Sequence, residues 1–323
     1  MLKAFHSNRT FVLILIPIIV SCFFLLNYFT SYHIVEKEIS FGLWGKWNAN
    51  GFSYLSFFAP ILVVAEAIFL NNLFNRNDFI DKNNYLPSLL YVVVLSFFHT
   101  FYFIDGSGMG LFFVIISLSH LFLLDQKIDG RKTVFNTAFY FGIACTFYPV
   151  LFLGVPLLFM MIWVNRPFIL RESLLTVTGI LVPLLYASLY RFFFDISINL
   201  SDLNSSSYEV FSIDMWVLII TTFCLFMIGL KPLLQALQTG SIRIKKIAKM
   251  LLILTLLLIA LFLLDVLTYR KVQSLSFLSV PLILALPYAF GEKNLRLSSS
   301  ILFYILFTYS VSKFFVSFND LAF

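Results

Sequence analysis

The side chains that could support chemistry are few, and the most suggestive are two carboxylates that follow the first apolar run. Glu36 and Glu38 lie in the polar stretch 31–51, which also contains Trp44 and Trp47. A carboxylate beside aromatic residues at a membrane surface can act as a general base or hold a divalent metal for sugar transfer. These two residues are the candidate catalytic groups, and a second polar stretch at 195–212 would help to form their site.

Two further ionisable side chains lie inside apolar runs. Glu66 occurs in the run 61–70, and His120 falls at a similar depth in another run. An ionisable residue within a membrane span is costly and marks a site by default. We predict a contact between Glu66 and His120, either as a buried pair that fixes helix packing or as part of a proton or ion pathway.

The amino-acid composition indicates whether these residues are positioned in water or in a membrane. Of the 323 residues, 60% are hydrophobic and 12% are charged. A soluble domain has about a quarter of its residues charged and under half apolar, so we expect an all-α integral membrane protein. The net charge of +6 then indicates retention of Lys and Arg on the cytoplasmic side and not a nucleic-acid partner.

Runs of about twenty apolar residues predict about eleven membrane spans, within a range of about ten to twelve. The expected spans are 11–30, 52–74, 86–104, 109–124, 134–148, 150–164, 173–194, 213–237, 247–269, 275–290 and 298–316. The pair on either side of Pro149 could instead form a re-entrant hairpin or one kinked span, with a break at the proline in every case. With the N-terminus inside, most of the 22 Lys and Arg residues fall on the cytoplasmic side.

One basic cluster stands at the start of the ninth expected span. Arg243, Lys245, Lys246 and Lys249 are spaced within two helical turns. Such a cluster on the cytoplasmic side attracts anionic lipid headgroups by about 1 kcal/mol for each basic residue. We expect membrane lipids to be its partners.

The order of elements up to residue 194 resembles the N-terminal module of the GT-C membrane glycosyltransferases. The segments that carry the resemblance are Asn75-Arg76-Asn77-Asp78, Leu86-Pro87, the charged turn 125–132, the Gly- and Ala-containing run 141–149, and the ending 165–168. The resemblance implies a polyprenyl-phosphate sugar as donor and a catalytic acid in the first outside loop. By position, Glu36 or Glu38 would take that role. It also implies that a divalent metal could be needed, although the sequence shows no metal-ligand spacing and no other cofactor.

A closer resemblance is to an uncharacterised family of polytopic inner-membrane proteins from Bacteroidota. It rests on Leu86-Pro87, Arg166-Pro167-Phe168, Arg171-Glu172, Gly179 and Pro183. The segment from Arg166 to Glu172 predicts a turn on the cytoplasmic side, which we call the elbow. In it Arg166 and Arg171 can reach lipid phosphates. Glu172 can bind Arg171 or a helix N-terminus, and Gly179 would allow two helices to approach closely.

The sequence therefore predicts one transmembrane domain over 1–323, with a GT-C-like module at 1–194 and further helices at 195–323. We place it in the bacterial inner membrane as a multi-pass protein. Its function stays open among three classes: an envelope glycosyltransferase that uses a lipid-linked sugar, a non-catalytic membrane subunit that binds a membrane-protein partner, and a transporter.

Overall fold

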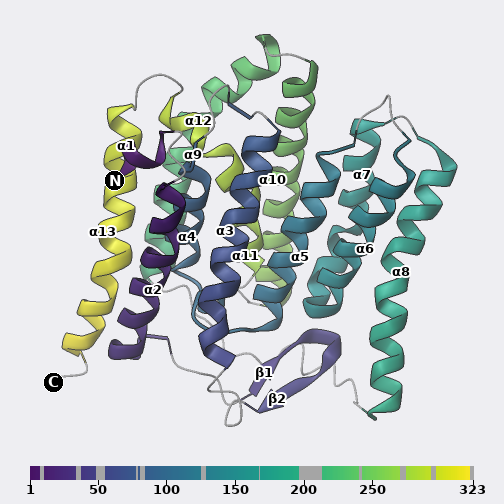
Figure 1. Ribbon diagram of the computed structural model, residues 1–323, viewed down its shortest axis with the longest axis horizontal. Helices are drawn as coiled ribbons and strands as arrows, with labels where there is room; N and C mark the ends of the chain where they lie inside the picture. The colour runs from purple at the N-terminus through teal and green to yellow at the C-terminus, as the bar shows by residue number, and fades with distance from the viewer. Residues whose placement is uncertain are drawn as a thin grey trace.

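Helices make up almost all of the regular structure in the computed structural model, which confirms the predicted all-α fold (Figure 1). The structure describes residues 1–7, 11–33, 38–48, 55–77, 79–80, 84–124, 129–166, 168–195, 213–239, 242–269, 274–291 and 296–320. The first helices are α1 (Leu2–Phe5), α2 (Val12–Thr30), α3 (Ala59–Arg76), α4 (Leu86–Leu95), α5 (Gly106–Leu121), α6 (Arg131–Phe147), α7 (Val155–Asn165) and α8 (Leu170–Phe193). The others are α9 (Ile213–Thr239), α10 (Ile242–Tyr269), α11 (Ser274–Ala285), α12 (Pro287–Phe290) and α13 (Leu297–Asp320).

Short elements join these helices. The 3-10 helices in the described ranges are η1 (Gly42–Trp44), η3 (Leu55–Phe58), η4 (His99–Phe101) and η5 (Pro149–Gly154). The strands β1 (Glu38–Ser40) and β2 (Lys46–Asn48) pair antiparallel, with Ile39 opposite Trp47. This β-hairpin, with η1 at its turn, lies across one end of the helices (Figure 1).

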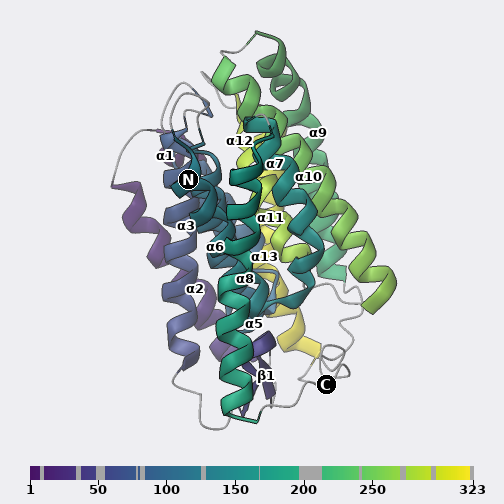
Figure 2. The same cartoon turned by 90° about the vertical axis from the view of Figure 1, so that its right-hand side faces the viewer.

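The long helices lie side by side and alternate in direction between two ends of the molecule (Figures 1 and 2). We call one the hairpin end, because β1 and β2 lie there with the last turns of α2, α6 and α8. The other is the basic end, which holds α1, α12 and the first turns of α6, α8 and α10. Basic residues in those first turns are Arg131, Lys132, Arg171, Lys245 and Lys249.

Within the described residues, four helices are long and apolar enough to cross a membrane, which is fewer than the eleven expected spans. They are α2, α8, residues Ile213–Gln235 of α9 and residues Leu297–Phe315 of α13. Other expected spans contain shorter helices: α4 has 10 residues, and α11 has 12 before the chain restarts as α12 at Pro287. At Pro287 the missing backbone N–H removes a hydrogen bond that would continue α11.

The chain breaks at Pro149 as predicted and then turns back along itself. Helix α6 ends at Phe147, and η5 begins at Pro149. At its far end α7 brings Arg166 against Gly130, the residue that precedes α6. Because α7 finishes beside the start of α6, segments 131–147 and 149–165 run antiparallel to each other and do not form one kinked helix.

Helices α6 and α8 pack closely because each presents a glycine to the other. A Cβ atom on Gly142 would lie 3.0 Å from the Cα atom of Ile180, and one on Gly179 would lie 2.8 Å from the Cβ atom of Ala138. The predicted role of Gly179 in close helix approach is therefore confirmed. Small residues at a crossing let two helix backbones approach closely and increase their van der Waals contact.

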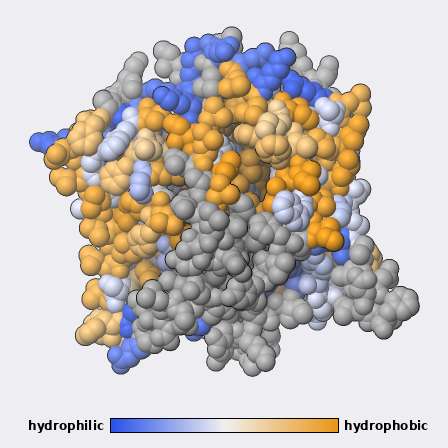
Figure 3. All heavy atoms as spheres, turned by 180° about the vertical axis from the view of Figure 1, so that it is seen from behind, coloured by the Kyte–Doolittle hydropathy of each residue, from blue (hydrophilic) through white to orange (hydrophobic). Residues whose placement is uncertain are grey.

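The surface between the two ends is apolar. Exposed side chains on α8 include Leu185, Tyr186, Leu189, Phe192 and Phe193. Figure 3 shows apolar residues spread over the back of the molecule between its ends, with hydrophilic residues gathered at the basic end. A soluble monomer seldom exposes a continuous apolar patch of more than about 600 Å², so this surface suits lipid.

Candidate functional site

The β-hairpin that carries the candidate catalytic residue Glu38 is fixed to the ends of α6 and α8. The indole Nε1 atom of Trp44 donates to the Thr146 Oγ1 atom at 3.1 Å, and its ring lies 5.1 Å from that of Tyr190. Gly42, with φ +63°, lies so close that a Cβ atom would be 2.4 Å from the Phe147 carbonyl oxygen. The structure describes Glu38 only through the backbone of β1, and Glu36 lies outside the described residues, as does most of 195–212.

Elsewhere at the hairpin end, the structure buries a lysine that was not among the predicted site residues. Lys313 in α13 is 4% exposed, and its Nζ atom donates to the Ser96 carbonyl oxygen at 2.5 Å. The same Nζ atom lies 4.5 Å from the ring centre of Phe97 and 5.0 Å from that of Phe314. A cation over aromatic faces gains an attraction that grows when water is excluded.

A carboxylate with two phenol partners lies near this lysine. Asp214, in the first turn of α9, accepts hydrogen bonds from the hydroxyl groups of Tyr309, at 2.6 Å, and Tyr32. An acidic residue at a helix N-terminus is also favoured by the helix dipole. Tyr309 and Lys313 are four positions apart in α13, so one face of this helix carries both the carboxylate's partner and the cation.

A histidine completes this group at the hairpin end. His33 follows the last turn of α2; its backbone N–H donates to the Asn27 Oδ1 atom at 2.8 Å, and its ring stacks on Tyr102 at 4.8 Å. Burial lowers the pKa of the His33 imidazole well below its usual range, and the charges of Lys313 and His99 act in the same direction. The imidazole is thus neutral, and its buried Nε2 atom has no hydrogen-bond partner among the described residues.

These residues, which we call the Lys313 group, are Lys313, Asp214, His33, His99, Tyr32, Tyr102 and Tyr309. They come from the loop after α2, from η4 and its C-cap, and from α9 and α13. Together they provide a cation, an ordered carboxylate and a neutral imidazole at the hairpin end. One signal in the sequence could have revealed the group: Lys313 is an ionisable residue inside the expected span 298–316.

The predicted pair of Glu66 and His120 does not form. The Tyr91 hydroxyl donates to the Glu66 Oε2 atom at 2.9 Å, whereas the ring of His120 stacks on Tyr140 at 5.4 Å. None of the contacts described for these two residues joins them. Similar depth in a membrane does not imply contact, because the rotation of each helix about its axis decides which side chains meet.

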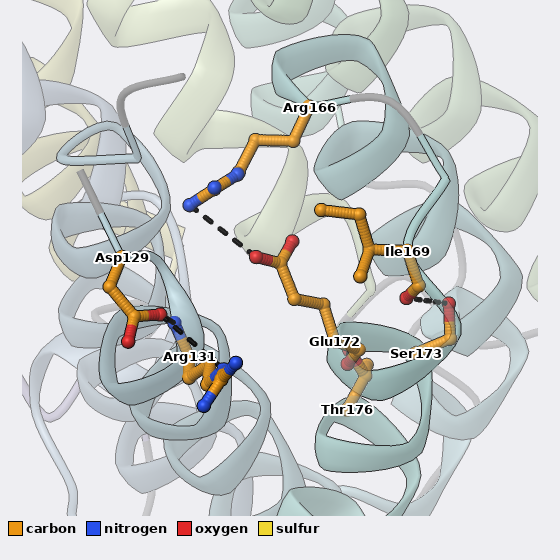
Figure 4. Close-up of polar contacts among 7 residues, drawn as sticks. All are labelled: Asp129, Arg131, Arg166, Ile169, Glu172, Ser173 and Thr176. Atoms are coloured by element: carbon orange, nitrogen blue, oxygen red, sulfur yellow. Dashed lines mark hydrogen bonds and ion pairs between the residues drawn. The ribbon is translucent and has the colours of Figure 1, made fainter. Parts of the chain in front are cut away.

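The predicted elbow contains a buried ion pair at the basic end. In this pair Glu172 binds Arg166 and not Arg171, which the sequence had suggested. The Arg166 Nη1 atom lies 3.4 Å from the Glu172 Oε1 atom, and both side chains are almost wholly buried (Figure 4). Arg171, the expected partner of Glu172, is exposed. The guanidinium of Arg166 also covers Gly130, where a Cβ atom would lie 1.9 Å from its Nη1 atom. The elbow therefore joins α6, α7 and α8.

Most of the predicted lipid-headgroup patch can be located on α10. Lys245 and Lys249 are exposed and Lys246 is half-buried, whereas the side chain of Arg243 lies outside the described residues. The described lysines occupy the first turns of the helix, at the basic end. This position is compatible with contact to headgroups and does not test it.

Between α5, α6, α7, α10 and α11 lies a cavity of about 40 Å³. Its lining includes Leu118, Phe141, Leu158 and Phe277. The hydroxyl of Ser117, also in the lining, already donates to the Thr137 carbonyl oxygen at 2.8 Å. A cavity with such walls stays dry and suits hydrocarbon.

Within the described ranges, no group of three or more His, Cys, Asp or Glu side chains could hold a metal ion. The chain matches no protein-family model, no curated protein and no solved structure. The resemblances to GT-C glycosyltransferases and to the Bacteroidota family therefore stay predictions.

Proposed function

We propose that this chain is a multi-pass protein of the bacterial inner membrane, with about eleven passes between its two ends. Four helices have the length and apolarity of membrane spans. The shorter helices α4, α5 and α11 run beside them and are largely buried by their neighbours. Short or broken helices are tolerated at membrane depth where protein surrounds them.

In this proposal the basic end faces the cytoplasm. Arg76, Arg131, Lys132 and Arg171 lie at that end, which matches the excess of Lys and Arg in cytoplasmic loops. A membrane-impermeant maleimide should label Lys46→Cys, in β2, on intact spheroplasts. It should label Lys245→Cys only after the membrane is opened. The reverse pattern would contradict the orientation.

For activity, we propose a GT-C-like glycosyltransferase that takes sugar from a polyprenyl phosphate at the hairpin end. The observation that carries this proposal is the docking of the hairpin: Gly42 and Trp44 hold the strand that begins with Glu38 against the ends of α6 and α8. A general base must be held at a fixed distance from its substrate. The apolar cavity between α5 and α10 adds a surface suited to hydrocarbon.

The test is complementation of a deletion strain with Glu36→Gln, Glu38→Gln and the double variant. Loss of the carboxylate should abolish rescue and cause polyprenyl-phosphate sugars to accumulate, as measured by mass spectrometry of extracted lipids. Asp129→Asn is the matched control, because Asp129 is an exposed carboxylate at the basic end and pairs with Arg131 at 3.6 Å. Each variant's abundance in the membrane is measured in parallel.

Full rescue by the double variant, with a normal lipid profile, would exclude this activity. If the chain is instead a non-catalytic membrane subunit, the double variant should rescue fully. A stoichiometric protein partner should then remain bound after mild detergent extraction. A transporter predicts that neutral variants of Glu66 lose activity at normal abundance.

A further inference from the structure

Glu66 presents a carboxyl group with one satisfied and one unsatisfied oxygen in the middle of the bundle. Its side chain belongs to α3 and is 1% exposed. The Oε2 atom accepts the hydrogen bond from Tyr91 at 2.9 Å. The Oε1 atom is buried and accepts no hydrogen bond from any described residue.

The elements that pack against α3 offer Glu66 no cation. Tyr91 faces it from α4, and Asp105, which begins α5, lies near enough for its charge to repel that of Glu66. The remaining titratable groups on these elements are His99 in η4, His120 in α5, and Cys22 and Tyr28 in α2; η3 and α11 contain none. Among the described residues, none forms an ion pair with Glu66.

The arrangement at Glu66 contrasts with that at Glu172, the second buried glutamate among the described residues. Glu172 lies 3.4 Å from the guanidinium of Arg166, which compensates its charge. Glu66 has a single neutral donor and a neighbouring carboxylate. A buried carboxylate without a cation is strongly disfavoured relative to its protonated form.

We propose that Glu66 is a proton-binding site within the bundle, with the proton on Oε1 and the Tyr91 hydroxyl bound to Oε2. Protonation removes the uncompensated charge and turns an unsatisfied acceptor into a hydroxyl donor. Asp105 disfavours ionisation further, while its own oxygens accept from the Gly108 N–H at 2.8 Å and from the Ser107 hydroxyl at 2.7 Å. Glu66 is therefore the residue of this pair that takes up and releases a proton.

Asp105 also lies on the side of Glu66 nearer the hairpin end. Gly106, the next residue, lies against the hairpin, where a Cβ atom would be 2.8 Å from the Ser40 carbonyl oxygen. The polar groups nearest to Glu66 thus lead toward the hairpin end. Proton exchange at Glu66 should respond to the pH on that side of the membrane.

The test uses dicyclohexylcarbodiimide, an apolar reagent that enters membranes and adds to protonated carboxyl groups. The acid proton moves to a reagent nitrogen while the carboxyl oxygen bonds to the central carbon. Transfer of the acyl group to nitrogen then gives a stable N-acylurea that retains all atoms of the reagent. Peptide mass spectrometry of the full chain in detergent should find the adduct on Glu66, and its yield should fall as the pH is raised.

Variants and an internal control make the result specific. Glu66→Gln should remove the adduct. Glu172 should remain unmodified in the same samples, because the Arg166 guanidinium lies 3.4 Å from its carboxyl group and compensates its charge. Tyr91→Phe removes a donor that favours the carboxylate, so the pH of half-maximal labelling should rise by about one unit, which is about a tenfold change in proton affinity.

A second measurement does not depend on access of the reagent. The infrared difference spectrum between the unchanged chain and Glu66→Gln should contain the carbonyl stretch of a protonated carboxylic acid, and that band should weaken as the pH rises. Equal labelling of Glu66 and Glu172 would overturn the proposal, as would absence of this band near neutral pH. Neither outcome bears on the proposed glycosyltransferase activity, which rests on Glu36 and Glu38.

Discussion

The Lys313 Nζ atom lies 2.5 Å from the carbonyl oxygen of Ser96, a residue 217 positions earlier in the chain. Ser96 caps the C-terminus of α4, and the Tyr102 hydroxyl donates to the same oxygen at 2.8 Å. The last carbonyl groups of a helix have no partner within it, and the helix dipole favours a cation there. A lysine from the last helix thus stabilises the C-terminal end of α4 inside the bundle.

This relationship predicts the effect of removing the charge. Lys313→Met keeps most of the side-chain volume but deletes the donor, so the free energy of unfolding should fall by about 1–2 kcal/mol. Because Tyr102 still satisfies the carbonyl, the double variant Lys313→Met/Tyr102→Phe should lose more than the sum of the two single variants. Thermal unfolding in detergent measures both effects. The exposed Lys249→Met is the control, and an equal loss in that variant would argue against a capping role.

The neutral His33 predicts a dependence of stability on pH. Its lowered pKa means that the unfolded chain binds a proton near pH 6.5 while the folded chain does not. Stability should therefore be full above about pH 6.5 and fall below it by up to about 1.4 kcal/mol for each pH unit, until the folded pKa is reached. Melting temperatures at several pH values should show a weaker acid dependence in His33→Gln. An unchanged dependence would assign the effect to another group.

Hairpin docking can be tested at one glycine. Gly42 has φ +63° and leaves no space for a side chain against the carbonyl oxygen of Phe147. Gly42→Ala should strain the backbone by about 1–2 kcal/mol, with a further cost from the clash. The hairpin should then be cut faster in limited proteolysis while α6 and α8 remain intact. Ser40→Thr, which keeps the hydroxyl that accepts from the Gly42 N–H at 3.4 Å, should leave the cutting rate unaltered; if it accelerates cutting equally, the docking contact is not specific.

The crossing of α6 and α8 can be tested by moving one methyl group between helices. Gly179→Ala places a Cβ atom 2.8 Å from that of Ala138 and should cost about 1–3 kcal/mol of unfolding free energy through overpacking. Adding Ala138→Gly removes that opposing atom and should recover part of the loss. Denaturation in detergent of the single and double variants measures the recovery. Simple addition of two losses would contradict the close contact.

Local features of the sequence predicted much of the fold. The excess of apolar residues predicted helices and a lipid-facing surface, because a backbone in a membrane must satisfy its hydrogen bonds within each segment. Pro149 predicted the break after α6, although Pro17, Pro183 and Pro232 lie inside the continuous helices α2, α8 and α9. Gly179 predicted a close crossing, although the sequence could not name Ala138 and Ile180 as the residues across it.

The pairing of polar side chains was decided only in three dimensions. Glu66 binds Tyr91 and not His120, Glu172 binds Arg166 and not Arg171, and Lys313 reaches Ser96 from the opposite end of the chain. Apolar composition specifies that a segment is a helix, but not how far the helix is rotated or which neighbours it meets. Those choices arise from packing among all helices at once, and they determine which of the few polar groups can act together.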